Sequence, residues 1–335
     1  MKKFLLPKEG NFYKANLHCH SNNSDGRLSP EEIKKIYKEK GYSIVAYTDH
    51  DILLDHQDLK DDTFLPLNGF EIEVNEDKEG PFCLKKSSHM CLIALDEDNL
   101  IQPCYHRTKY LFGNAPNLRD QIKYDETLPD FERQHNSECV SEIMQTGREK
   151  GFFVTYNHPT WSLDDYMDYT NYSGMHAMEI CNYGSMSFGY DEYNEKEYDD
   201  LLRCGKRIYA IGADDNHNKR DDAFGAFTMI KADKLEYKTI TNALVDGNFY
   251  ASQGPKIYEL YFEDGKIYVK CSNAKMIRLN TAIRVLKYEK AEDDKFVNEA
   301  CFEIEKDYGY VRITVVDENG KHANTNAYFT DELFK

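Results

Sequence analysis

The chain has 335 residues, enough for about two domains of ordinary size. Hydrophobic residues make up 41% of the chain and charged residues 30%, which is typical of a folded enzyme and excludes a disordered chain. The formal charge of −17 repels polyanions, so binding along duplex DNA or RNA is not expected.

Membrane insertion and secretion are not expected either. No run approaches the ~18 apolar residues that a membrane helix needs. The apolar segment 4–6 ends at Pro7, well short of a signal peptide. The nine cysteines, an odd number without a CxxC pair, are typical of reduced thiols. We therefore expect a cytoplasmic protein.

Short apolar runs alternate with helical stretches between residues 11 and 250. Strands are expected at 11–20, 43–48, 64–74, 90–95, 152–157, 177–181, 208–213 and 225–230, and helices at 30–40, 131–150, 193–204 and 235–246. The first helix carries a capping box of Ser29 and Glu32, with Pro30 at its first position. Repeated β-then-α at this spacing predicts an α/β barrel or a doubly wound sheet.

After Gly254 and Pro255 the pattern changes to short strands joined by turns. These are expected at 257–262, 266–271, 277–279, 283–288, 300–305 and 310–316, which indicates a small β-sandwich. The predicted domains are therefore 1–254 and 255–335. Within the first, the polar and irregular residues 96–129 are expected to form an insertion over the active-site face.

Histidines and carboxylates gather where strands are predicted to end. His18 and His20 share one face of the first strand, and two such imidazoles can converge on one cation. Each group alone also fits a solvated loop or an ordinary core histidine, but their repetition at strand ends, where barrel enzymes collect catalytic residues, indicates a multi-metal site. The remaining members of these groups are Asp25, Asp49, His50, Asp51, Glu71, Glu73, His89, His158, Asp214, Asp215 and His217.

In their order (HxH, SDG, TDHD, a Glu-bearing strand, His, NHP and DxH), these motifs resemble the polymerase and histidinol phosphatase (PHP) superfamily. The resemblance implies a distorted (β/α)7 TIM-like barrel holding up to three divalent metals. It implies His18, His20, Glu71 and Asp215 as ligands of the first ion, Glu71, His89 and His158 of the second, and Asp25, His50 and His217 of the third. Glu71 is preferred to Glu73 because it stands two residues after Gly69, as in the family's motif.

The sequence departs from the family pattern in two places, at Asp214 and in the long, charged segment between Glu71 and His89. Asp214 replaces the usual small residue before DxH, and we expect it to accept a hydrogen bond from a ligand histidine, with a solvated charge as the alternative. The segment 246–255 and the β-module after it are similar to the carbaryl-hydrolase-like metallohydrolase branch, although Gly254-Pro255 also fits a simple linker turn. The remaining histidines, His56, His106, His135, His176 and His322, lack acidic strand-end context and are expected at the surface or in the core.

The expected chemistry is hydrolysis by a hydroxide bridging two or three Mn, Fe or Zn ions. The predicted catalytic residues are Glu71, Asp215 and His217. Four residues near the ligand motifs are expected to bind substrate, each with surface or core packing as the alternative: Arg27, Lys219 and Arg220 for phosphate, and Trp161 as a wall of the pocket or a stacking partner for a base.

The leading hypothesis is a phosphoesterase acting on a small phosphorylated molecule, a nucleotide or a short oligonucleotide end. The acidic surface argues against long duplex nucleic acid as a partner. A carboxylic ester or carbamate metallohydrolase is the alternative enzyme, and a catalytically silent metal- or sugar-binding module is the alternative from another class.

Overall fold

The computed structural model describes residues 2–335. Up to residue 252 the elements are β1 (Lys3–Phe4), β2 (Asn11–Asn16), α1 (Pro30–Glu39), β3 (Ile44–Tyr47), η1 (Gln57–Leu59), β4 (Leu65–Asn75), η2 (Phe82–Leu84), β5 (Ser87–Ala94), η3 (Ala115–Gln121), α2 (Ser137–Glu149), β6 (Phe152–Asn157), α3 (Tyr166–Tyr169), β7 (Ala177–Asn182), α4 (Tyr183–Ser187), α5 (Glu195–Arg203), β8 (Tyr209–Ala213), β9 (Phe227–Ala232), α6 (Tyr237–Val245) and β10 (Phe249–Ser252). The remainder are β11 (Ile257–Glu263), β12 (Lys266–Ala274), β13 (Met276–Thr281), β14 (Lys287–Lys290), β15 (Val297–Glu303), η4 (Lys306–Tyr308), β16 (Tyr310–Val316), β17 (His322–Thr325), β18 (Tyr328–Phe329) and α7 (Thr330–Leu333).

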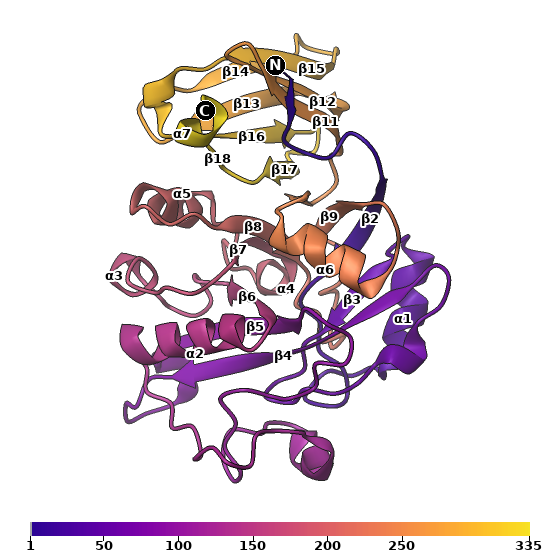
Figure 1. Ribbon diagram of the computed structural model, residues 1–335, viewed down its shortest axis with the longest axis vertical. Coiled ribbons are helices and arrows are strands. Elements are labelled where there is room, and N and C mark those ends of the chain that lie inside the picture. The colour runs from indigo at the N-terminus through magenta and orange to yellow at the C-terminus, as the bar shows by residue number, and fades with distance from the viewer. Residues whose placement is uncertain (1) are drawn as a thin grey trace.

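A mixed sheet forms the centre of the α/β part (Figure 1). Its strands are hydrogen-bonded in the order β9-β2-β3-β4-β5-β6-β7-β8. β2, β3 and β4 are parallel, as are β6, β7 and β8, whereas β5 runs antiparallel to both its neighbours. The start of β5 therefore lies at the same edge as the carboxyl ends of the parallel strands, which positions its residues beside theirs.

The strand path does not close into a hydrogen-bonded barrel among residues 2–335. β8 is the last strand of the path, and no backbone ladder joins it to β9. Instead the Thr228 side chain of β9 bonds the backbone of β8: its Oγ1 accepts from Gly212 N at 3.2 Å and donates to Gly212 O at 2.9 Å. Beyond the strands, His20 N donates to Asn216 O at 3.0 Å. The α/β prediction is thus confirmed, but the closed (β/α)7 TIM-like barrel is not.

The helix starts follow local capping chemistry. The capping box of Ser29 and Glu32 is present at the start of α1, as expected. The predicted helix 131–150 is wrong over its first six residues, because Asn136 is the N-cap of α2 and accepts from Cys139 N at 2.8 Å. Residues 131–135 have no regular secondary structure, and there Arg133 forms a buried ion pair with Asp51.

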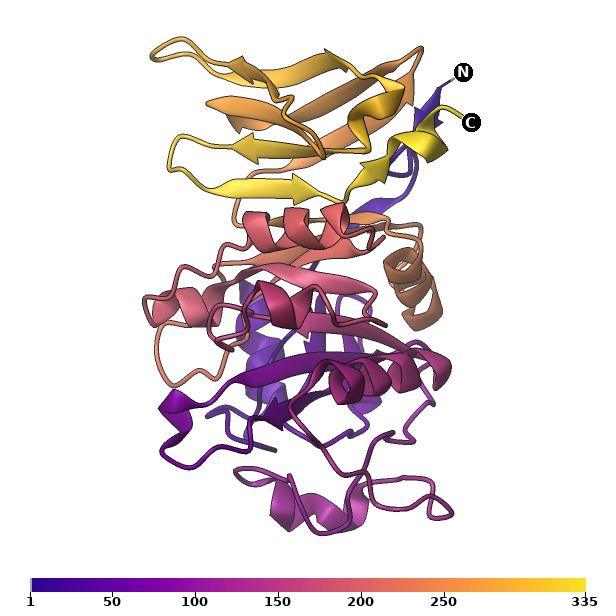
Figure 2. The same ribbon diagram turned by 90° about the vertical axis from the view of Figure 1, so that its left-hand side faces the viewer.

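The C-terminal strands lie in two layers above the α/β part (Figures 1 and 2). One layer is the sheet β1-β11-β12-β15; the other, β14-β13-β16-β17, continues through β10 into the central sheet. The expected strand 283–288 is displaced to β14, because residues 282–286 form the turn before it. Strands β10 and β17 join the two parts of the chain and were not among the expected strands.

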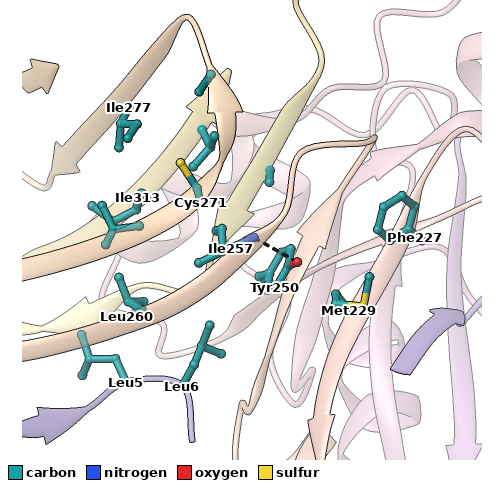
Figure 3. Packing of buried hydrophobic residues seen from close by; sticks show 14 of the residues in the cluster. Leu5, Leu6, Phe227, Met229, Tyr250, Ile257, Leu260, Cys271, Ile277 and Ile313 are labelled. Atoms are coloured by element: carbon teal, nitrogen blue, oxygen red, sulfur yellow. Dashed lines mark hydrogen bonds between the residues drawn. The ribbon is translucent and has the colours of Figure 1, made fainter. Parts of the chain in front are cut away.

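One hydrophobic cluster spans both parts of the chain. Figure 3 shows Leu5 and Leu6 packed beside Leu260, with Ile257 N donating to Tyr250 Oη at 3.0 Å. Cluster members also come from α1, β3 and β16. The boundary predicted at residue 254 therefore crosses a continuous sheet and a shared core.

The one helix or strand within residues 96–129 is the 3-10 helix η3, and this segment packs on a small apolar cluster around Ile52, Tyr105 and Ile122. Asn114 N donates to Ser24 O at 2.7 Å, which anchors this segment near the SDG turn. Within residues 2–335, none of the helices combines the length and apolar character needed to cross a membrane.

Candidate metal centre

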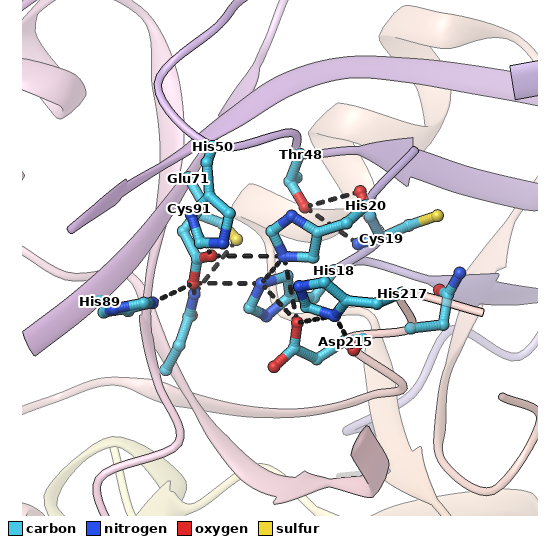
Figure 4. Close-up of polar contacts among 12 residues, drawn as sticks. His18, Cys19, His20, Thr48, His50, Glu71, His89, Cys91, Asp215 and His217 are labelled. Carbon is cyan, nitrogen blue, oxygen red and sulfur yellow. Dashed lines mark hydrogen bonds and ion pairs between the residues drawn. The ribbon is translucent and has the colours of Figure 1, made fainter. Parts of the chain in front are cut away.

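Nine side chains converge at the edge of the central sheet where the parallel strands end. Figure 4 labels His18, His20, His50, Glu71, His89, Asp215 and His217 among them. They come from the segments after β2, β3, β6 and β8, from within β4 and from the start of β5. The nine are the predicted ligands His18, His20, Asp25, His50, Glu71, His89, His158, Asp215 and His217.

Glu71 lies in the middle of five imidazoles. Its Oε1 is 3.1 Å from His18 Nε2, 3.2 Å from His89 Nδ1 and 3.4 Å from His158 Nε2. Its Oε2 is 3.3 Å from both His20 Nε2 and His50 Nδ1. The Glu71 side chain is 1% exposed.

Glu73 lies at the margin of the same cluster. Its side chain is 23% exposed, against 1% for Glu71, and its nearest imidazole contact is 3.7 Å, to His89 Nε2. Strand alternation brings both carboxylates to one face of β4, but only Glu71 lies within 3.4 Å of five imidazoles.

The first predicted ligand group has the spacing of a coordination shell. His18 Nε2 and His20 Nε2 are 3.1 Å apart, and Asp215 Oδ1 is 3.2 Å and 3.1 Å from them. Ligand atoms about 2.1 Å from one divalent ion are separated by about 3–3.5 Å from each other. These atoms and Glu71 therefore fit one cation.

The third predicted group surrounds a single carboxylate oxygen. Asp25 Oδ1 is 3.3 Å from His217 Nε2, 3.8 Å from His50 Nε2 and 3.9 Å from His20 Nδ1. In the second group, His50 joins Glu71 and His89, while His158 also lies close to His18 and Glu179. Shared neighbours make the three groups one continuous cluster.

Several buried polar atoms of the cluster lie near charged groups but form no hydrogen bond with the described residues. They are His20 Nδ1, Asp25 Oδ1, His50 Nδ1, His89 Nδ1 and Asp215 Oδ1. Buried polar atoms without hydrogen bonds are rare and destabilising. A ligand that binds imidazole nitrogen and carboxylate oxygen at once would satisfy all of them. Divalent metal ions of the Mn, Fe or Zn type fit this donor set.

The electrostatics of the cluster lead to the same conclusion. Burial alone would lower the pKa of His20, yet the Asp215 and Glu71 carboxylates raise it to about 10, and the same kind of opposition raises the pKa of His158 to about 9. Burial and the charge of His20 lower the pKa of His50 well below its usual value. The carboxylates thus favour protonated His20 and His158, whereas His50 is kept neutral. Bound cations would neutralise the carboxylates while all the imidazoles stay neutral.

Backbone strain accompanies the cluster. Asp215 and His158 have positive φ angles, +51° and +26°, which non-glycine residues adopt at a cost of order 1–3 kcal/mol. Hydrogen bonds hold both: Asp215 N donates to His18 O at 2.9 Å, and His158 N donates to Glu179 Oε2 at 3.0 Å. Such strain is concentrated at functional sites.

Glu179 is a site residue that sequence reasoning missed. It is fully buried on β7, and its Oε1 accepts from His18 Nδ1 at 2.8 Å. Its Oε2 accepts from Asn182 Nδ2 at 2.8 Å and from His158 N at 3.0 Å. One carboxylate therefore orients the ring of His18 and the backbone of His158, both of them predicted ligands. The signal was present in the sequence, because Glu179 interrupts an otherwise apolar predicted strand.

Asp214 does not serve a ligand histidine, contrary to expectation. Its side chain is buried and accepts from the backbone N–H groups of Phe224, Gly225 and Ala226 at 2.8–3.0 Å and from Tyr37 Oη at 2.9 Å. Alternation after β8 turns it away from Asp215, and burial raises its pKa to about 6. Its role is to hold the loop before β9.

A cavity of about 300 Å³ opens over the cluster. Of the four predicted substrate contacts, Trp161, Lys219 and Arg220 line it, and Lys219 Nζ is 2.9 Å from Asp25 Oδ2. Arg27 is exposed and is not among the lining residues; its backbone N–H donates to His217 O at 2.8 Å. The structure therefore does not place the Arg27 side chain in the cavity, contrary to the prediction.

The remaining histidines lie outside the cluster, as expected. His56 stacks on Tyr47, and His176 accepts from Val154 N at 3.0 Å. His322 packs against Tyr193. Two of them do have acidic neighbours, which sequence reasoning did not find: His106 lies beside Glu132, and His135 beside Asp164.

Neither a family model nor a curated protein matches the chain. Among solved structures, it is similar over 98% of its length to 97% of a two-domain protein from Bacteroides vulgatus ATCC 8482 containing a predicted PHP-like metal-dependent phosphoesterase, at 15% identity and a TM-score of 0.44. A proposed metal-dependent phosphoesterase from Bifidobacterium adolescentis ATCC 15703 matches 62% of this chain and 89% of its own, at 15% identity and a TM-score of 0.37. An amidohydrolase from Chromobacterium violaceum, with bound sulfate and no metal, matches 61% of this chain and 87% of its own, at 15% identity and a TM-score of 0.37.

Proposed function

We propose that the chain is a metal-dependent phosphoesterase of the PHP type that hydrolyses a small phosphorylated substrate, a nucleotide or a short oligonucleotide end. The observation that carries this proposal is the convergence of nine imidazole and carboxylate side chains beneath a cavity that Lys219 and Arg220 also line. Metal-type donors and side-chain cations in one cavity suit an anionic ester.

Two or three Mn, Fe or Zn ions are proposed as cofactors. His18, His20, Glu71 and Asp215 would hold one, Glu71, His89 and His158 a second, and Asp25, His50 and His217 a third. When bound, such ions lower the pKa of water toward neutrality and stabilise charge on phosphoryl oxygens. Glu71, at the centre of the imidazoles, would fix the spacing of the ions.

The chain's own residues supply the orientation. Glu179 fixes the ring of His18, and Asp222 accepts from His217 N at 3.1 Å and Asn218 N at 3.0 Å, which holds the loop carrying His217. Lys219, half exposed at the cavity, is placed to meet a phosphate oxygen on entry. The His217 side chain is 23% exposed, more than any other histidine of the cluster, so we assign it to the substrate side.

We further propose a cytoplasmic setting and a small-molecule partner. All nine cysteines are unpaired, which suits a reducing compartment. The charge of −17 opposes long nucleic acid, whereas a small phosphate ester needs only the local positive charge of the cavity.

The test is release of inorganic phosphate by Mn-reconstituted protein from nucleoside monophosphates and 3′,5′-bisphosphates. We expect release that is lost in His158→Ala, with His56→Ala as a matched variant of a buried histidine outside the cluster. If metals bind and the wild type releases no more phosphate than His158→Ala, the phosphoesterase proposal is wrong, and carboxylic esters and carbamates become the substrates to assay.

A further inference from the structure

Aromatic side chains surround the mouth of the cavity. Phe82, Phe112 and Phe188 line it and are 50%, 51% and 53% exposed, and Trp161 lies beside them. They come from four separate segments: η2, the loop before η3, the end of α4 and the turn after β6. We call these four residues the aromatic mouth.

The packing of the fold does not account for this arrangement. An exposed phenylalanine gains nothing from the core, and three of them around one opening form an apolar patch of the kind that marks a binding site. Trp161 packs edge-on against the rings of His89 and His158, with centroids 5.0 Å and 5.1 Å apart, and its ring lies 6.0 Å from that of Phe82. Trp161 thus joins the aromatic mouth to two of the predicted metal ligands, His89 and His158.

Positive charge adjoins the same rings. The Arg220 guanidinium lies 3.5 Å from the centroid of the Phe188 ring, and Lys219 bonds Asp25 on the cavity wall. Apolar faces and cations together favour a ligand that combines a flat ring with an anionic group.

Resting on the proposed function, we infer that the aromatic mouth selects phosphate esters whose organic part carries a flat aromatic ring, and discriminates against plain sugar phosphates. A cavity of about 300 Å³ accommodates a ligand of mononucleotide size, with its phosphate toward the ligands and its ring among Phe82, Phe112 and Phe188. A sugar phosphate would meet the same cations but leave these rings exposed to water.

The experiment compares adenosine 5′-monophosphate with ribose 5-phosphate, which carry the same phosphate ester and differ in the base. Trp161 is the one tryptophan of the sequence, so its fluorescence reports occupancy of the cavity. Quenching is read in Mn-loaded protein in the first seconds after mixing, before turnover. We expect the nucleotide to bind at least about tenfold more tightly, the amount that stacking on aromatic rings contributes.

The variants Phe188→Ala and Phe112→Ala should each reduce that preference by about five- to tenfold. Phe296→Ala, which removes an exposed phenylalanine of the C-terminal strands, should leave it unchanged. Equal affinity of the wild type for both ligands, or a preference that survives both cavity variants, would overturn the inference. Tighter nucleotide binding without phosphate release would support it while refuting the phosphoesterase activity, and equal binding with release would do the reverse.

Discussion

At the scale of single residues, one buried carboxylate organises the candidate centre. Glu71 meets five imidazole nitrogens within 3.4 Å and also accepts from Asn157 Nδ2 at 3.0 Å. Burial would raise the pKa of Glu71, but the charges of His18 and His89 lower it well below its usual value. A carboxylate kept ionised in the interior requires cations around it, which is the requirement of a metal bridge.

Glu71→Gln should therefore remove bound metal, whereas Glu73→Gln should not. The amide cannot bridge two cations, and the expected loss is at least one equivalent of metal per chain and about 100-fold in phosphate release. Metal content by elemental analysis after Mn loading measures it. Equal losses in the two variants would contradict the assignment of the central role to Glu71.

His176 offers a pH-dependent test away from the centre. Burial and the charge of Arg148 lower the pKa of His176 from 6.5 to about 4, and its Nδ1 accepts from Val154 N. As pH falls from about 6.5 to about 4, the unfolded chain takes up this proton and the folded chain does not, so folding stability decreases over that window. His176→Asn keeps an acceptor but does not titrate.

We expect the loss of unfolding free energy between pH 7 and pH 4.5 to be about 2 kcal/mol smaller in His176→Asn than in the wild type. Urea unfolding of metal-free protein at the two pH values measures the difference, and comparison with the wild type cancels the titration of the cluster. An identical loss in both proteins would show that His176 does not titrate in this way.

At the scale of elements, the start of α4 fits tightly against the loop that carries two candidate ligands. Gly184 N donates to Asp214 O at 2.6 Å. A Cβ at Gly184 would lie 2.7 Å from the carbonyl oxygens of both Asp214 and Asp215. Glycine is needed here for the close approach, because backbone on both sides must otherwise move.

Gly184→Ala should displace the loop with Asp215 and His217. We expect a loss of about 1–3 kcal/mol in unfolding free energy and a drop in metal affinity. The matched variant Gly254→Ala meets only ordinary contacts, with Lys321 Cδ at 3.5 Å, and should change neither. Calorimetric metal titration and urea unfolding separate the two effects, and wild-type behaviour of Gly184→Ala would mean that the loop adapts freely.

Strand ends and their ligands could be predicted from the sequence more accurately than the start of α2 or the positions of side chains in loops. The polar residues at strand ends could be predicted because period-2 alternation stops there, and all nine predicted ligands lie in one cluster. The start of α2 was predicted too early, because residues 131–136 have helical composition but form an irregular segment in which Arg133 pairs with Asp51. Phe82, Phe112 and Phe188 could not be predicted, since three loops far apart in sequence carry no shared local pattern.

At the scale of the whole molecule, a buried ion network ties the C-terminal strands to the α/β part. Arg312 of β16 is 2% exposed and bonds Asp199 with Nε at 2.9 Å and Nη2 at 3.0 Å, and Glu195 with Nη1 at 3.0 Å. Both carboxylates belong to α5, which Figure 2 shows between the two parts. Thr314 Oγ1 also donates to Glu195 at 3.0 Å.

Arg312→Ala should destabilise the entire chain. Without Arg312, Glu195 keeps the Arg278 cation at 3.0 Å and Asp199 keeps only the Arg203 cation at 3.9 Å. Loss of the buried guanidinium that joins the two carboxylates should cost about 3 kcal/mol. Because the sheet runs through β17 and β10 and one apolar cluster spans both parts, the loss should appear in a single unfolding transition. Trp161 fluorescence follows the α/β part, and far-ultraviolet dichroism follows the whole chain.

The control is Arg207→Ala, whose pairs with Asp331 and Glu332 also link the two parts but are half exposed, so it should cost no more than about 1 kcal/mol. Coincident transitions by both probes, shifted strongly in Arg312→Ala and weakly in Arg207→Ala, are the expected result. If the Trp161 transition stayed at its wild-type position while part of the dichroism signal was lost earlier, the C-terminal strands would be an independent domain. The shared sheet and core argue against that outcome, since neither part can expose β10 or β17 without breaking strand pairs and apolar contacts of the other.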